Sequence, residues 1–63
     1  MKPTELEIKV LKMLNKDLPQ ERGSWVNACV EFLGEMGYVS RQAPYRISER
    51  GKEFLRDLKR RLP

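Results

Sequence analysis

The chain has 63 residues and lacks the covalent staples on which domains of this size often depend. A domain this short buries only about 60% of the surface of its unfolded chain, so small domains often add disulfides, a structural metal or a second copy. Because Cys29 is the single cysteine and histidine is absent, neither an intramolecular disulfide nor a zinc site is expected. We predict one domain over residues 1–63 that binds no metal and no cofactor, and a homodimer remains the open way to add stability.

The composition also bears on where the protein works. The first ten residues contain acidic side chains and a proline, where a signal peptide would need an apolar run. No stretch approaches the roughly 18 apolar residues of a membrane span. A cysteine without a partner fits a reducing compartment. These features predict a cytoplasmic protein with no membrane partner.

Hydrophobic periodicity predicts a first helix near the N-terminus. Thr4 and Glu7 have the spacing of a capping box, in which each residue satisfies a backbone N–H group of the other. Leucine and valine then recur at helical spacing, and Pro19 cannot continue the pattern. The predicted helix runs from about residue 5 to about residue 17.

A second helix is predicted over residues 25–36, after a short connector. Ser24 is suited to cap its first turn, and Gly37 is suited to end it in the left-handed conformation. Most positions of this helix are apolar. Such a wide apolar surface predicts that the helix is central to the core or also faces a partner.

The remaining pattern predicts a hairpin followed by a third helix. Residues 38–41 and 45–48 alternate in polarity around a turn that contains proline, which is typical of two short paired strands. Ser48 is then placed to cap a helix from residue 49 to about residue 61, whose apolar stripe is surrounded by arginine and lysine.

Positive charge is concentrated in the second part of the chain. Residues 1–36 hold five basic and six acidic side chains, whereas residues 37–63 hold eight basic and three acidic ones, giving net charges of −1 and +5. Such an excess is typical of a surface that meets an anionic polymer. It is equally typical of a solvated helix that keeps a small protein soluble, and charge alone leaves both interpretations open.

The order of helix, short hairpin and helix carries a specific string of residues. These are Leu33, Gly37, Tyr38 and Val39, followed by Tyr45, Ile47, Ser48, Gly51 and Leu55. Over roughly residues 26–58 the string resembles the C-terminal half of winged-helix transcription regulators of the MarR and PadR kind. The resemblance implies a mainly α fold with a small β-hairpin, a minimal winged helix of three helices and a two-stranded wing.

The resemblance also implies a function, which is binding to double-stranded DNA by a small regulator of transcription or recombination. In winged-helix and helix-turn-helix proteins the start of the recognition helix enters the major groove, and the wing follows the backbone or minor groove. The DNA-contacting residues implied here are Arg22, Ser24, Asn27, Arg41, Gln42, Arg46, Arg50 and Lys52. Ser24 has a second interpretation as a simple helix cap, and the hairpin arginines have one as charges that protect strand edges.

An alternative function is a protein–protein interaction module, such as an inhibitor or adaptor from a mobile genetic element. The second helix contains no lysine or arginine and is expected to expose Glu31 and Glu35, which suits a protein partner better than phosphates. Trp25 and Phe32 would form the interaction patch, although aromatic residues at helical spacing are also ordinary core residues.

Catalysis finds no support among the residues of the chain. Histidine is absent, and neither paired carboxylates in a plausible cleft nor a glycine-rich phosphate loop can be placed. A domain of this size also has little room for a substrate pocket. We therefore predict a protein that is not an enzyme and has no small-molecule substrate.

Overall fold

The first helix, α1 (Glu5–Leu14), begins at the predicted capping box. In the computed structural model, which describes residues 3–61, the Glu7 carboxylate accepts a hydrogen bond from the Thr4 backbone N–H at 3.3 Å. The same carboxylate accepts a second bond from the Thr4 hydroxyl. The predicted start of this helix is confirmed.

The end of α1 differs from the prediction, because the helix stops at Leu14 and not near Asp17. Lys16 adopts a left-handed conformation with φ of 65°. Its N–H donates to the Met13 carbonyl at 3.0 Å, and the N–H of Asp17 donates to the Lys12 carbonyl at 2.8 Å. These two bonds are the pair that closes a helix at a left-handed residue.

The second helix, α2 (Ser24–Glu35), ends one residue before the predicted Met36, and Gly37 takes the predicted left-handed conformation. Gly37 has φ of 82°, and the Tyr38 N–H donates to the Leu33 carbonyl at 2.9 Å, so the chain turns sharply out of the helix. The start is corrected by one residue. Gly23 occupies the N-cap position, Ser24 is already helical, and no side chain caps this end.

The third helix, α3 (Glu49–Arg61), confirms the prediction, including its cap. The Ser48 hydroxyl accepts the Gly51 N–H at 3.1 Å and donates to the Gly37 carbonyl at 2.6 Å. One hydroxyl therefore ties the start of α3 to the end of α2. The glycine at position 51 also allows a close approach, because an added Cβ atom there would overlap the Tyr38 carbonyl oxygen.

The predicted two-stranded wing is wrong. Within residues 3–61 no strand forms, and the segment between α2 and α3 is a loop with a single antiparallel bridge between Val39 and Ile47. The adjoining Ser48 N–H donates to the Tyr38 carbonyl at 2.9 Å. The chain is mainly α-helical as expected, but the sheet element of a winged helix is missing.

The ladder stops because a side chain replaces a backbone acceptor. The Ser40 N–H donates to the Arg46 carbonyl at 2.9 Å, as in paired strands. The return bond from the Arg46 N–H goes to the Ser40 hydroxyl at 2.9 Å. That hydroxyl also lies 3.2 Å from the Gln42 carbonyl oxygen and 3.3 Å from that of Pro44. Since Pro44 has no N–H, the tip has no donor there with which to extend a ladder.

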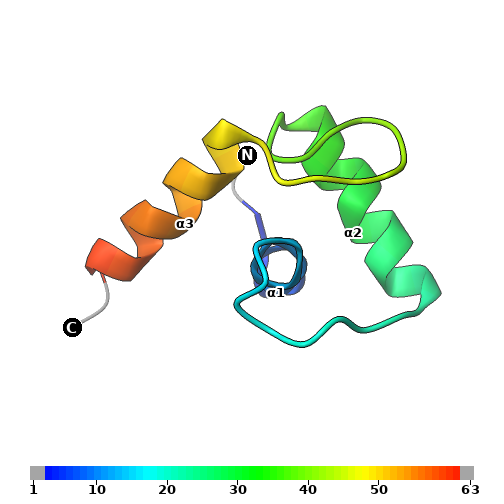
Figure 1. Ribbon diagram of the computed structural model, residues 1–63, viewed down its shortest axis with the longest axis horizontal. Coiled ribbons are helices and arrows are strands. Elements are labelled where there is room, and N and C mark those ends of the chain that lie inside the picture. Colours follow the sequence, from blue (N-terminus) through cyan, green and yellow to red (C-terminus); the bar gives the residue numbers. More distant parts are fainter. Residues whose placement is uncertain (1–2, 62–63) are drawn as a thin grey trace.

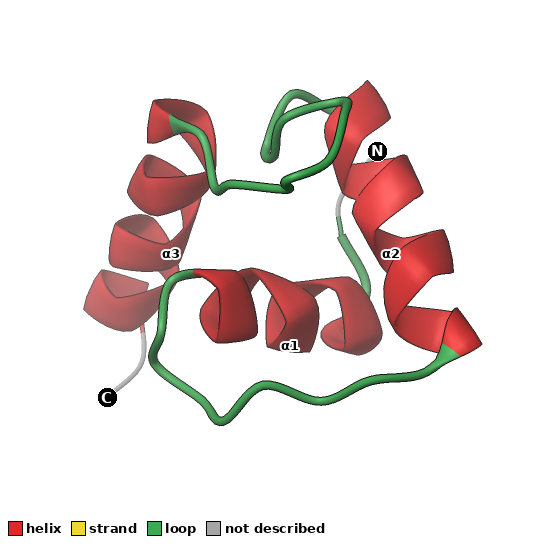
Figure 2. Ribbon diagram, turned by 45° about the vertical axis from the view of Figure 1, so that its right-hand side comes forward, coloured by secondary structure: helices red, strands yellow, loops and turns green. Residues whose placement is uncertain are grey.

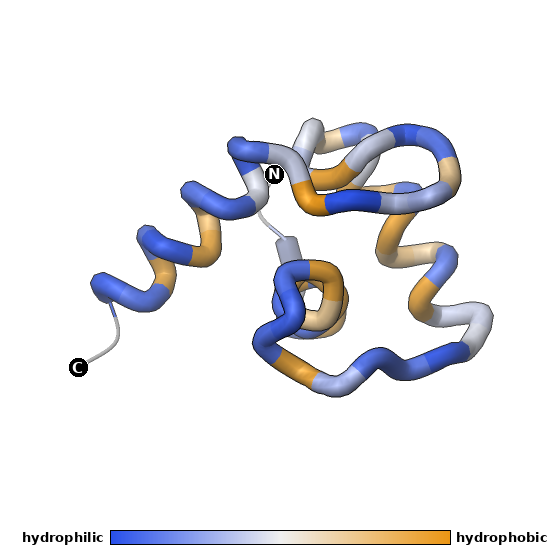
Figure 3. The backbone as a smooth tube through the Cα atoms, in the orientation of Figure 1, coloured by the Kyte–Doolittle hydropathy of each residue, from blue (hydrophilic) through white to orange (hydrophobic). Residues whose placement is uncertain are grey.

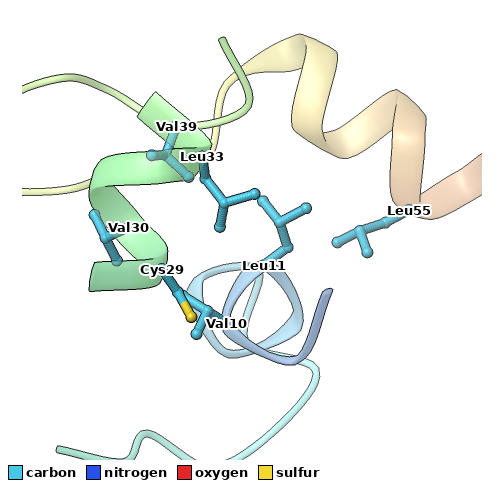
Figure 4. Packing of buried hydrophobic residues seen from close by; sticks show 7 residues of the cluster. All are labelled: Val10, Leu11, Cys29, Val30, Leu33, Val39 and Leu55. Carbon is cyan, nitrogen blue, oxygen red and sulfur yellow. The ribbon is translucent and has the colours of Figure 1, made fainter. Parts of the chain in front are cut away.

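The helices are arranged around α1, which lies across the space between α2 and α3 (Figures 1 and 2). Both outer helices pack against it. Figure 4 shows Leu11, Leu33 and Leu55, one from each helix, pointing toward a common centre. The buried cluster consists of Val10, Leu11, Cys29, Val30, Leu33, Val39 and Leu55. No helix among the described residues has the length and apolar character needed to cross a membrane.

Candidate nucleic-acid interface

The cationic side chains of the loop and α3 are all exposed, and we call residues 41–61 the basic segment. It carries Arg41, Arg46, Arg50, Lys52, Arg56, Lys59, Arg60 and Arg61. Two of these cations have ion-pair partners on the same helix. Lys52 Nζ lies 3.5 Å from Glu49 Oε1, and Arg61 Nη2 lies 3.2 Å from Asp57 Oδ2. The other six form no ion pair within the part of the chain that the structure describes.

Helix α3 has a narrow buried face, which leaves most of its surface to charged groups. Gly51 and Leu55 are its buried residues. Hydrophilic residues cover most of this helix and part of the loop (Figure 3). Lys59, Arg60 and Arg61 occupy the last turn, where the helix dipole favours positive charge. The fold therefore tolerates a dense group of cations at this end.

Helix α2 presents the opposite charge. It contains no basic residue, and Asn27, Ala28, Glu31 and Glu35 are all exposed. Arg41 lines a hollow together with Glu31 and Glu35, so one loop arginine lies beside this helix. The outer face of the predicted recognition helix is therefore acidic.

The structure does not gather the predicted DNA-contacting residues into one patch. Arg22, Ser24 and Asn27 are exposed around the first turn of α2. The loop packs near the last turn of α2, where a Cβ atom on Gly34 would lie 3.6 Å from the Cα of Arg41. Ten residues of helix separate the two places, which is about 15 Å. The two groups of residues lie near opposite ends of α2.

The other predicted contacts belong to the loop and to the start of α3. Gln42 and Arg46 are exposed on the loop. The Arg50 guanidinium lies 5.4 Å from the centre of the Tyr38 ring, which is a cation–π contact. Lys52 is exposed and pairs with a neighbouring glutamate. These residues continue directly into the cations of α3.

Both aromatic residues of the predicted interaction patch, Trp25 and Phe32, are half-buried. Trp25 is half-buried, packs against the core cluster, and has the Lys9 ammonium 5.5 Å from the centre of its ring. Lys9 in turn lies 2.9 Å from Glu21 of the connector. Phe32 is half-buried too, but it is not among the side chains that pack against the cluster. The two aromatic residues therefore have different surroundings.

Sequence reasoning missed the cations in the middle and at the end of α3. Arg56, Lys59 and Arg60 counted toward the charge excess but were not named as contacts. Their position around the apolar stripe was predicted, but the winged-helix resemblance directed attention to the loop and the start of the helix. Tyr38 and Phe54 were also missed; their ring centres lie 5.1 Å apart beside Arg50.

Two polar contacts of the buried Glu7 carboxylate lie apart from the basic segment. The Thr4 hydroxyl, donating to the Glu7 carboxylate, holds the pKa of that carboxyl below its usual range. Burial and the nearby Glu7 carboxylate raise the pKa of the Cys29 thiol, whose Sγ lies 3.8 Å from Glu7 Oε2. A thiol held in its neutral form is a poor nucleophile. Among residues 3–61 no three acidic or cysteine side chains gather in a way that could hold a metal ion.

Comparison of the chain with protein-family models, with curated proteins and with solved structures finds no match.

Proposed function

We propose that the protein binds double-stranded DNA through phosphate contacts made by the basic segment, as a small regulator of transcription or recombination. The observation that carries this proposal is the set of six exposed cations without an ion-pair partner in the described chain. Lysine and arginine that neutralise phosphates release condensed counterions, which supplies most of the sequence-independent affinity for DNA.

The proposal differs from the winged-helix arrangement in which α2 enters the major groove. Glu31 and Glu35 on the outer face of α2 would repel phosphates. The 13 residues of α3, by contrast, span about 20 Å and can follow the backbone of one strand past several phosphates. Contacts to phosphates position a protein without selecting a sequence, so we expect weak sequence preference.

The test is a titration of labelled random duplex with protein, followed by fluorescence anisotropy at about 50 and about 200 mM salt. We expect an affinity that falls steeply with salt. The variant Arg41→Gln with Arg46→Gln should bind more weakly and lower the log–log salt slope by about 2, if each arginine contacts one phosphate.

The matched control is Lys12→Gln with Lys16→Gln, which removes the same charge from α1 and the turn after it. If the proposal holds, this control keeps nearly the full salt slope, because long-range attraction is screened within about 10 Å at 0.1 M salt. Equal losses in both variants would mean that total charge matters and the basic segment does not. Absence of binding at low salt would refute the proposal.

A second candidate function is a protein–protein interaction module centred on α2, which includes self-association. It is favoured by Phe32 of α2, a half-buried aromatic residue that does not pack against the core cluster. Sedimentation velocity of the wild type and of Phe32→Ser tests self-association. A dimer that dissociates in the variant supports this candidate, and a monomer in both excludes a homodimer through this face.

A further inference from the structure

A surface groove beside α3 has aromatic side chains and several arginines in its lining. Tyr38 and Phe54 contribute the rings, and Arg50, Arg56 and Arg60 contribute the cations. The volume of the groove is about 490 Å³, within the range of about 300 to 1,000 Å³ that is usual for sites of small ligands. Its dimensions therefore suit one or two nucleotide units.

The lining of this groove differs from that of two other hollows in the described chain. The hollow beside α2 contains two carboxylates and one arginine, with no aromatic ring. The hollow between α3 and the turn after α1 also lacks an aromatic ring, and its two lysines and one arginine stand against Asp17 and Glu49. Volume and net charge do not set the groove apart, but of these three sites within residues 3–61 the groove at Tyr38 is the one that combines aromatic rings with arginine.

We propose that this groove binds an unpaired nucleotide of the DNA to which the protein is bound. Proteins hold single-stranded nucleic acid by stacking bases on aromatic or guanidinium planes and by tracking phosphates with cations. The inference rests on the proposed function, since it assigns an additional site to the same basic segment. It predicts a preference for duplexes with a single-stranded end over blunt duplexes.

The two rings and Arg50 form the stacking surface. The Tyr38 and Phe54 rings are tilted by 37° at a centre-to-centre distance of 5.1 Å, and both residues are half-buried. The Arg50 guanidinium lies 5.4 Å from the centre of the Tyr38 ring. Because this arginine is exposed, a base can stack on its plane or take its place on the ring.

Two carboxylates also line the groove and shape the expected ligand. Asp57 lies 3.2 Å from Arg61, which offsets part of its charge. With Glu53 included, three cations and two anions line the groove, and the net charge of the lining is +1. Glu53 offers an acceptor for the exocyclic amino group of cytosine, so a cytosine overhang is the appropriate probe.

The experiment compares a blunt duplex of about 20 base pairs with the same duplex carrying an overhang of about six cytosines, both read by anisotropy at about 50 mM salt. The overhang should increase affinity about tenfold, the scale of stacking one or two bases. Tyr38→Leu and Phe54→Leu should each abolish most of this gain, so that the ratio of overhang to blunt affinity falls to near one. Tyr45→Leu is the matched control, because Tyr45 packs against the core but does not line the groove.

A second pair of variants avoids the core altogether. Arg60→Gln removes a lining cation, whereas Lys59→Gln removes the neighbouring cation that does not line the groove. Both should weaken blunt binding, but only Arg60→Gln should reduce the ratio of overhang to blunt affinity, by about threefold. This pair keeps the proposal testable if the leucine variants unfold.

The two proposals fail in different ways. Blunt binding with no gain from the overhang overturns the groove and leaves the proposed function standing. A gain that Tyr45→Leu and Lys59→Gln reduce as much as the groove variants also overturns it. Absence of binding to either DNA overturns the proposed function, and the groove proposal falls with it.

Discussion

The α1–α2 pair and α3 have different relations to the core. Five of the seven residues in the buried cluster come from α1 and α2, whereas α3 contributes only Leu55. The balance of charge is reversed, since the segment after residue 36 carries the whole positive excess. Helices α1 and α2 therefore supply most of the buried cluster, whereas α3 supplies one buried residue and presents cations.

This division has a physical reason in a domain of 63 residues. A core this small has limited apolar area to distribute, so three helices cannot all be deeply buried. A helix held by one buried leucine and a few half-buried neighbours leaves most of its perimeter free for charged groups. A marginal core is thus compatible with a dense charged surface, provided that the charges lie on the least buried element.

The sharpest test of this division is a pair of leucine truncations. Leu11→Ala removes a side chain with no solvent exposure and should cost about 2–5 kcal/mol. Domains of this size have only a few kcal/mol in total, so this variant should be largely unfolded. Leu58→Ala on α3 removes a half-buried side chain and should cost about 1 kcal/mol. Urea unfolding followed by circular dichroism measures both.

Similar losses of unfolding free energy at the two positions would contradict this division. They would mean that α3 is as strongly anchored as α1, and that the charged helix contributes to the fold as much as the other two.

The next test concerns the contact between α3 and the loop that precedes it. Gly51 of α3 packs so closely on the loop that an added Cβ would overlap the Tyr38 carbonyl and lie 2.8 Å from Ile47 Cγ1. Gly51→Ala should therefore cost about 1–3 kcal/mol through forced shifts of the backbone. Urea denaturation provides the measurement.

Gly34→Ala is the control for this substitution. The nearest atom to its added Cβ is the Ser40 carbonyl oxygen at 3.5 Å, an ordinary contact. Alanine also favours a helix by about 0.5–1 kcal/mol over glycine, so this variant should be neutral or more stable. If Gly51→Ala were as stable as this control, the close approach of α3 to the loop would not be needed.

How far the sequence predicted the fold depends on whether local signals were sufficient. The bounds of α3, its Ser48 cap and the left-handed turn at Gly37 followed from local patterns and are confirmed. The end of α1 was missed because a lysine, Lys16, takes the left-handed position that usually signals itself through glycine. Such a choice depends on contacts that the local sequence does not reveal.

The wing and the site show two further limits of sequence reasoning. Alternating polarity predicted paired strands, but the Ser40 hydroxyl took the place of a backbone acceptor, and a pattern of polarity does not contain this competition. The charge excess of the second part of the chain was evident from the sequence. The closeness of Tyr38 to Phe54, 16 residues apart in the chain, required the tertiary structure.

The N-terminal part should also determine the response to acid. Because the Glu7 pKa is lowered in the folded state, its contribution to stability is complete above the ordinary value of 4.5 and is lost as pH falls through the lower folded value. Glu7→Gln should remove this part of the acid dependence, an effect of about 1 kcal/mol, the size of a helix cap. Thermal unfolding between about pH 2 and pH 7 measures it. An unchanged acid dependence in the variant would assign it to other carboxylates.

The smallest expected effect on stability belongs to the ion pairs of α3. Asp57 lies 3.2 Å from Arg61, and both side chains are more than half exposed, so Asp57→Asn should change the free energy of unfolding by less than about 0.5 kcal/mol. The same change releases Arg61 to meet a phosphate and should tighten duplex binding, with a salt slope steeper by about 0.9. Urea unfolding and anisotropy on one preparation give both numbers.

Glu5→Gln, at the exposed start of α1, removes the same charge from the other part of the molecule and should leave the salt slope unchanged. If Asp57→Asn instead destabilised the protein without affecting DNA, the charges of α3 would serve the fold, and the division between a packing part and a charged part would be wrong.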